Sequence, residues 1–158
     1  MSSFTSELKV EPLSDGNNWR LLQPFSYHVG SKYSKNTIKV PKRFVTDFAS
    51  IPQFIIAILG LVCLFAGHIC NNVWLLIFGV VAILAASLMP NWGKYGKSSV
   101  VHDYLYYSKM FTRNISDGIF LEAMKVSSVN YIERYAMYYA VRIFGWITWK
   151  KGNRKNAL

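Results

Sequence analysis

The sequence predicts an α+β fold, in which a small antiparallel β ribbon and about three helices form one domain that carries an inserted two-helix hairpin of transmembrane type. Three observations lead to this fold class. Residues 19–48 consist of short β-branched or aromatic runs separated by proline and glycine. Residues 54–92 contain no Asp, Glu, Lys or Arg. Residues 97–149 place apolar side chains at helical spacing.

The composition excludes several classes of protein. The chain has 158 residues, of which 52% are hydrophobic and 16% aromatic, and such a chain is not intrinsically disordered. Its 18 Lys and Arg against 8 Asp and Glu give a formal net charge of +10. The basic residues are scattered and accompany no groove-reading motif, so we expect no specific nucleic-acid partner. Cys63 and Cys70 lie too far apart along one helix for a disulfide.

The first part of the domain is predicted to be a β ribbon. Residues 19–29 and 37–45 have strand character, and the polar residues 30–36 between them suit a hairpin loop. We expect residues 1–53 and 90–158 to form the single small α+β domain, with residues 54–89 as the insertion.

The insertion contains two apolar runs, 54–70 and 73–89, joined by Asn71 and Asn72. Each run has 17 residues, which as a helix would span about 25 Å. A chain of this length cannot surround two helices that are apolar on every face, so a membrane hairpin is favoured over a buried one. Basic residues flank the block on both sides, and the N-terminus lacks the features of a signal peptide. We therefore expect a lipid membrane as partner, with the globular part on the cytoplasmic side.

Three helices are predicted after the insertion. The first covers residues 97–109, with Ser98 or Ser99 as N-cap. The second is opened by Ser116 and Asp117 and covers residues 118–126, and the third covers residues 131–149. The basic residues after this third helix are expected to be solvated or to touch acidic lipid headgroups.

One polar cluster could carry chemistry. His102 and Tyr106 share a helix face at i, i+4, whereas the neighbouring Asp103 is rotated by about 100° and must serve a different partner. In one interpretation His102 is a general base toward water, Asp103 holds a hard cation, and Asp117 orients the imidazole. In the other, His102 bonds a buried carboxylate in a structural network, and Asp103 pairs with an arginine, Arg142 or Arg113.

The string HDYLY at residues 102–106 resembles the HD-x-x-Y active-site helix of secreted and parvoviral phospholipases A2. The resemblance implies that His102 is the catalytic base, Asp103 a calcium ligand, Tyr106 a hydrogen-bonding partner and Asp117 the orienting carboxylate. No glycine-rich calcium loop like that of those enzymes precedes this helix.

A second resemblance covers most of the chain. Four ordered blocks are similar to an uncharacterised family of small proteins encoded by tailed bacteriophages and prophages: VPKRFVTDFASIP, VHDYLYY, SDGIFLEAM and MYYAVRIFGWITW. The resemblance implies a phage origin, often near tail or lysis genes. It also makes Asp47 a candidate metal ligand beside Asp103, whereas the sequence alone favours a turn or capping role for Asp47 with Thr46 and Ser50.

Three functions follow as expectations. The first is a bacteriophage protein that inserts into the host inner membrane during infection, either directly or after delivery from the virion tail. The second is a hydrolase of lipid or cell-envelope esters that uses His102, Asp117 and Tyr106, with calcium as a possible cofactor. The third is a structural tail component whose hairpin packs against other virion proteins.

Overall fold

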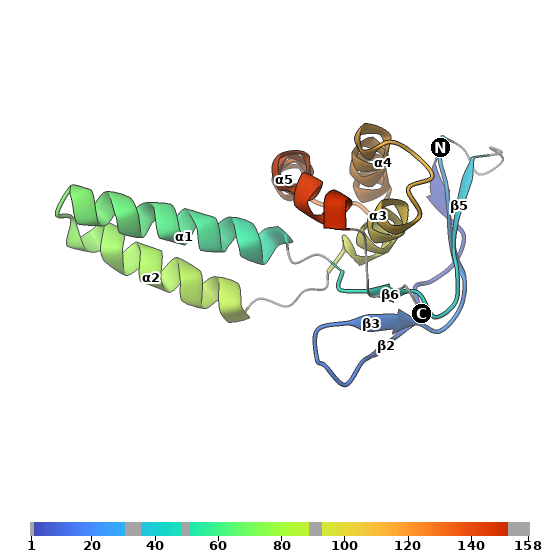
Figure 1. The fold of residues 1–158 in the computed structure, drawn as a ribbon, viewed down its shortest axis with the longest axis horizontal. Helices are drawn as coiled ribbons and strands as arrows, with labels where there is room; N and C mark the ends of the chain where they lie inside the picture. Colours follow the sequence, from blue (N-terminus) through green and yellow to red (C-terminus); the bar gives the residue numbers. More distant parts are fainter. Residues whose placement is uncertain (1, 31–35, 49–50, 89–92, 152–158) are drawn as a thin grey trace. The chain divides into compact units, whose positions relative to one another are not determined.

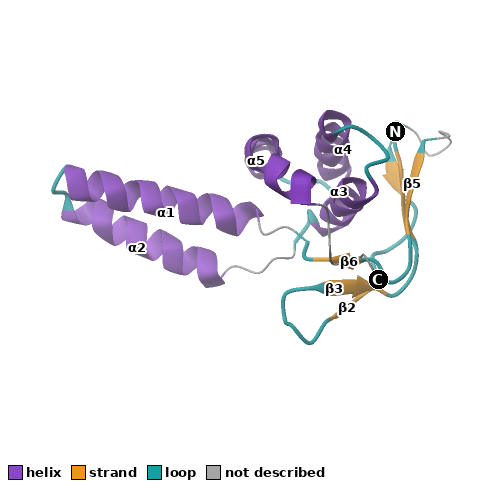
Figure 2. Cartoon of the chain, viewed as in Figure 1, coloured by secondary structure: helices purple, strands orange, loops and turns teal. Residues whose placement is uncertain are grey.

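The computed structural model describes residues 2–30, 36–48, 51–88 and 93–151 (Figure 1). The chain divides into two compact units, one made of Met1–Ala49 with Trp92–Leu158 and the other of Ser50–Asn91. The described residues form an α+β structure with two small antiparallel sheets and five helices (Figure 2). All the strands and three of the helices belong to the first unit.

The second unit is a helical hairpin of α1 (Ile51–Ile69) and α2 (Val73–Leu88). Glycines allow these helices to pack closely, because a Cβ at Gly60 would lie 2.9 Å from the carbonyl oxygen of Gly79. Asn72 caps the N-terminus of α2. Its Oδ1 accepts hydrogen bonds from the backbone N–H groups of Trp74 at 3.0 Å and Leu75 at 3.3 Å.

The prediction of a transmembrane-type hairpin is wrong. Of the helices in the described ranges, none has both the length and the apolar character needed to cross a membrane. With a rise of 1.5 Å per residue, the 16 residues of α2 span about 24 Å, against a hydrocarbon core of about 30 Å. The 19-residue α1 includes Pro52 and Gln53 in its first turn, so its apolar run is shorter than the helix.

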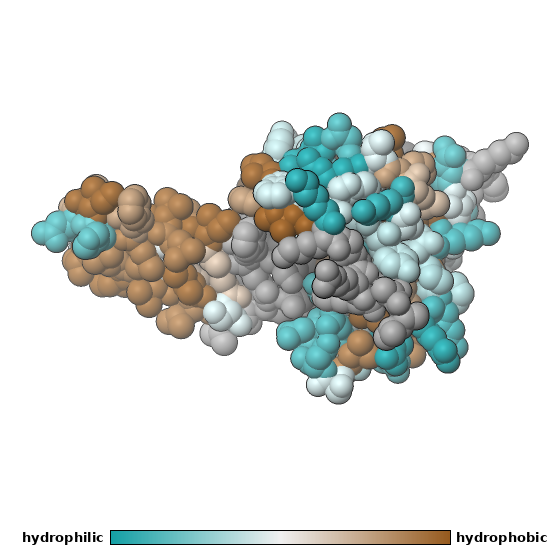
Figure 3. Space-filling model, viewed as in Figure 1, coloured by the Kyte–Doolittle hydropathy of each residue, from teal (hydrophilic) through white to brown (hydrophobic). Residues whose placement is uncertain are grey.

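The surface of the hairpin is nevertheless apolar (Figure 3). Hydrophilic residues gather at its turn, while the rest of the visible face is hydrophobic. Among the described side chains of the hairpin, twelve large apolar ones are exposed, including Phe65 at 69% and Trp74 at 76%. Soluble monomers rarely expose an apolar surface of this extent without covering it with a partner.

The strands of the first unit form two three-stranded sheets rather than the single ribbon predicted over residues 19–48. The order in one sheet is β1-β4-β5 and in the other β2-β3-β6, and all pairs are antiparallel. The difference arises because β3 pairs with β6 whereas β4 pairs with β5, and the two short strands before residue 19 then add one outer strand to each sheet. The strands are β1 (Ser3–Phe4), β2 (Val10–Pro12), β3 (Trp19–Leu21), β4 (Phe25–His28), β5 (Thr37–Val40) and β6 (Val45–Thr46).

Side-chain alternation places one face of β4 and β5 in the core. Phe25 pairs with Val40 and Tyr27 with Ile38, and these four side chains are at most 1% exposed. The residues between them along each strand lie on the opposite face and are more accessible. The two-residue period of the sequence therefore fixes the register.

Helices α3 (Gly96–Ser108), α4 (Arg113–Val126) and α5 (Tyr131–Lys151) follow the hairpin. The predicted N-cap of α3 at Ser98 or Ser99 is wrong, because the helix begins at Gly96 and the Ser99 hydroxyl donates to the Tyr95 carbonyl at 3.1 Å. Helix α3 ends where Lys109 adopts a left-handed conformation with φ of 50°.

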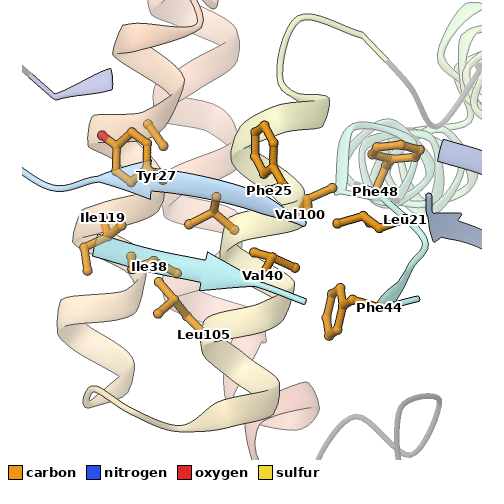
Figure 4. Close-up of a cluster of buried hydrophobic side chains, with 12 residues drawn as sticks. Leu21, Phe25, Tyr27, Ile38, Val40, Phe44, Phe48, Val100, Leu105 and Ile119 are labelled. Atoms are coloured by element: carbon orange, nitrogen blue, oxygen red, sulfur yellow. The ribbon is translucent and has the colours of Figure 1, made fainter. Parts of the chain in front are cut away.

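The hydrophobic core lies between β4, β5 and the first two of these helices (Figure 4). Val100 and Leu105 of α3 are fully buried and belong to one cluster with the inward side chains of β4 and β5. Phe44 and Phe48 extend this cluster past the end of β5. This packing fixes α3 against the sheet and so positions the polar side chains on its other faces.

Candidate functional site

The candidate site begins on α3, where His102 and Tyr106 stand one helical turn apart. Their rings contact each other with centroids 4.2 Å apart. The His102 ring also packs against Phe120 of α4 at 4.5 Å, and only 6% of the His102 surface is exposed. The imidazole is thus held by aromatic contacts from two helices.

Helix α4 brings the carboxylate of Asp117 to these two side chains. Asp117 is fully buried, and its Oδ1 accepts a hydrogen bond from the Tyr106 hydroxyl at 2.7 Å and lies 3.2 Å from His102 Nε2. Asp117 lies in the second turn of α4 rather than at its start, since the helix begins at Arg113. It shares a helix face with Phe120 and Met124, three and seven positions later, and both of these are fully buried.

Helix α5 supplies the counter-charge to Asp117. Arg142 Nη1 donates to Asp117 Oδ2 at 2.9 Å. Arg113, one turn before Asp117 on α4, approaches the same oxygen to 4.0 Å and donates to the backbone carbonyl oxygens of Val141 and Arg142. A buried carboxylate needs such partners, because an unpaired one would cost several kcal/mol.

These contacts set the protonation of the site. Burial alone would raise the pKa of Asp117, but hydrogen bonds from His102, Tyr106 and Arg142 outweigh it and lower the pKa below the ordinary value. Burial, followed by the hydrogen bond to Asp117, raises the pKa of Tyr106, so its hydroxyl remains a neutral donor. An ionised carboxylate can only accept hydrogen bonds, and therefore His102 Nε2 carries the hydrogen that faces Asp117.

A glycine on α5 leaves room for this arrangement. A Cβ at Gly145 would lie 2.5 Å from the Tyr106 hydroxyl oxygen, closer than non-bonded atoms approach. The ring of Trp149, one turn further along α5, contacts the Tyr106 ring edge-on at 5.1 Å. Tyr106 is thus fixed by α5 while its hydroxyl reaches Asp117.

Asp103 faces away from this network, as its position on the helix predicts. Its Oδ2 accepts a hydrogen bond from the Thr46 hydroxyl at 2.5 Å, and Thr46 Oγ1 accepts the backbone N–H of Phe48 at 3.0 Å. The alternative in which Asp103 pairs with Arg142 or Arg113 is wrong, because both arginines approach Asp117 instead. Asp103 instead ties α3 to β6.

The calcium site at Asp103 and Asp47 stays a prediction. Asp47 follows Thr46 in the chain and is partly exposed. In the part of the chain that the structure describes, no group of three or more His, Cys, Asp or Glu side chains stands close enough to hold a metal ion. Asp103 offers a single carboxylate that already accepts a hydrogen bond from the Thr46 hydroxyl.

The sequence identified three members of this network but not the role of its arginine. His102 and Tyr106 follow from helical spacing, and Asp117 from its position on the next helix. Arg142 was assigned to the wrong carboxylate, because nothing local relates residues 25 positions apart. Its signal was available in its own helix, where Arg142 directly follows two buried apolar residues, Ala140 and Val141.

Fold and site together define a small α+β protein with a buried His–Asp–Tyr–Arg network shared by three helices. The chain belongs to the family described as "Protein of unknown function (DUF1353)", whose profile matches residues 19–66 and 78–141. The matched ranges contain His102, Asp117 and Tyr106 but end at residue 141, one position before Arg142. No curated protein and no solved structure matches the chain significantly. The predicted membership of an uncharacterised family is confirmed, and its phage origin stays a prediction.

Proposed function

We propose that this protein is a hydrolase of carboxylic esters in which His102 is the general base. The observation that carries the proposal is the contact of 3.2 Å between His102 Nε2 and the buried carboxylate of Asp117. This contact holds the ring in one tautomer and leaves Nδ1 free of the carboxylate, as a general base requires. The phospholipase-like HDYLY helix suggests lipid or cell-envelope esters as substrates.

The proposed reaction uses water as nucleophile. His102 Nδ1 takes a proton from the water while the water oxygen bonds to the ester carbonyl carbon. The bond from that carbon to the alcohol oxygen then breaks, and the proton on Nδ1 passes to the leaving alcohol. Asp117 stabilises the transient imidazolium and stays ionised throughout.

Tyr106 and Arg142 act on Asp117 rather than on the substrate. The Tyr106 hydroxyl satisfies the same oxygen that His102 contacts, and Arg142 holds the other oxygen. Together they fix the carboxylate in one orientation, which supports the role of positioning residues for both.

The test compares two histidine variants. His102→Gln keeps an amide N–H able to donate to Asp117 but removes the base, so the fold should remain while kcat falls by about 10² to 10⁴ fold. The control is His28→Gln on β4, where His28 Nδ1 contacts the Thr37 hydroxyl at 2.9 Å, and its rate should not change. The assay uses fluorogenic phospholipid vesicles and p-nitrophenyl esters. Unchanged hydrolysis by a folded His102→Gln variant would overturn the proposal, as would a wild-type rate no higher than that of buffer.

A second proposed role rests on the hairpin. Its exposed apolar side chains support attachment of the protein to an apolar partner, which matches the predicted membrane-inserting and structural tail roles without a helix that crosses the bilayer. Flotation with anionic lipid vesicles tests the membrane role, and mass spectrometry of purified phage particles tests the tail role. Absence from both fractions would remove this second role.

A further inference from the structure

A separate pocket lies where the loop before α3 meets the end of α4. It has a volume of about 310 Å³. Its walls come from three parts of the first unit: β1, the start of α3 with the turn before it, and the residues that follow α4. The lining residues are Phe4, Gly93, Lys94, Lys97, Val126, Ser127 and Ser128.

The chemistry of these walls selects an anion. Lys94 and Lys97 bring two ammonium groups, and Ser127 and Ser128 bring two hydroxyls, whereas none of the described lining residues carries a carboxylate. Two ammonium groups beside one cavity repel cations and attract a group with two negative charges. The hydroxyls add hydrogen-bond donors that a simple positive surface patch lacks.

Several of these groups are held in place by the fold. Lys97 Nζ lies 5.9 Å from the centre of the Phe4 ring, so the amine is positioned over an aromatic wall. The Ser127 hydroxyl is 3.1 Å from that of Ser98, a fully buried residue of α3. Ser128 adopts a left-handed backbone with φ of 53°, and its N–H donates to the Lys125 carbonyl. The loop after α4 is therefore fixed around the pocket.

We propose that this pocket binds the phosphate of a phosphate ester. A phosphate carries close to two negative charges and three terminal oxygens, which match two lysines and two hydroxyls better than the single charge of a carboxylate. The volume leaves space beside the phosphate for the group esterified to it. The proposal stands independently of the hydrolase, because none of its residues belongs to the His102 network.

The test measures binding of inorganic phosphate to the full chain by NMR titration. Wild type should show saturable shifts at Ser127 and Ser128, and Lys94→Ala with Lys97→Ala should weaken binding by about tenfold for each lysine lost. Lys125→Ala is the matched control, since it removes the same charge from an exposed position near the end of α4 that does not line the pocket. Equal weakening by the control would show general charge attraction and overturn the proposal.

Two further ligands distinguish the source of the phosphate. Glycerol 3-phosphate represents a soluble ester, and vesicles containing phosphatidic acid represent a lipid headgroup. Binding of either that depends on Lys94 and Lys97 supports the pocket and identifies the source. If neither binds, or if Ser127→Ala and both lysine variants bind as wild type does, the proposal is overturned.

Discussion

Replacing Arg142 by methionine is the sharpest test of the energetics of the buried site. Methionine keeps an unbranched apolar stem but removes the guanidinium that donates to Asp117 Oδ2 at 2.9 Å. Asp117 is fully buried, so the variant leaves a buried carboxylate with a missing donor. Removing one partner of a buried ion pair costs about 3 to 5 kcal/mol.

The expected loss is smaller than this full value for two reasons. The Arg142 side chain is 30% exposed, and Arg113 remains 4.0 Å from the same oxygen. Tyr106 and His102 also continue to satisfy the other oxygen. We therefore expect a loss of about 2 kcal/mol in the free energy of unfolding at pH 7, the order of one charged hydrogen bond.

The assay is urea unfolding followed by circular dichroism at several pH values. Because the folded-state pKa of Asp117 is lowered, its contribution to stability is present above the unfolded pKa of about 3.9 and is lost as the pH falls through the folded pKa. Arg142→Met removes one cause of this lowering. The stability gap between wild type and variant should therefore be widest at neutral pH and should narrow below about pH 4.

The control is Arg20→Met, which breaks the ion pair with Glu11 on the surface. Both side chains of that pair are more than 40% exposed, so the loss should stay below about 1 kcal/mol. Equal losses for the two variants would refute the reasoning about burial. A gap for Arg142→Met that is the same at pH 7 and pH 3 would refute the role of the Asp117 charge.

Three further predictions concern other parts of the structure. Gly145→Ala would place a Cβ 2.5 Å from the Tyr106 hydroxyl and should lower the stability measured by thermal unfolding by about 1 to 3 kcal/mol. At Gly118 a Cβ meets nothing within 4 Å, so Gly118→Ala should be neutral or stabilising. Equal effects of the two variants would contradict the close packing at Gly145. Thr46→Val should destabilise the protein by about 1 to 3 kcal/mol, because it removes the hydroxyl that donates a hydrogen bond to the Asp103 carboxylate on α3. Thr46→Ser keeps a hydroxyl at this position and should recover most of the lost stability. Phe65→Lys, at a position 69% exposed, should reduce self-association in light scattering without lowering helix content, and unchanged association would show that this surface is not what drives it.

The helices of this protein were more predictable than the strands. Apolar periodicity indicated helices at 97–109, 118–126 and 131–149, and the structure has helices at 96–108, 113–126 and 131–151. The start of α4 was missed because its first turn, Arg113 to Ser116, carries no apolar repeat apart from Ile115. Strands β1 and β2 have two and three residues, and such short segments become strands only through pairing with β4 and β3.

The sequence also predicted that the two apolar runs form helices, but it did not predict correctly whether these helices can cross a membrane. The two apolar runs do form the helices α1 and α2, yet neither helix meets the requirements for crossing a membrane. Residues 54–92 contain no charge, and the described side chains of the hairpin place large apolar groups on its surface as well as between its helices. An uncharged run of this kind therefore predicts an exposed apolar surface, and a surface of this extent is typical of an interaction site.

A structural role and a catalytic role of this network place different requirements on the His102 side chain. A buried Asp117 is already balanced by Arg142, and Tyr106 donates to the oxygen that faces α3, so a purely structural network needs only a further donor there. A glutamine at position 102 could supply that donor and would preserve stability. Only catalysis needs a second ring nitrogen with a free lone pair. A His102→Gln variant that keeps its stability but loses activity therefore supports the hydrolase. A variant that keeps both its stability and its activity supports a purely structural network.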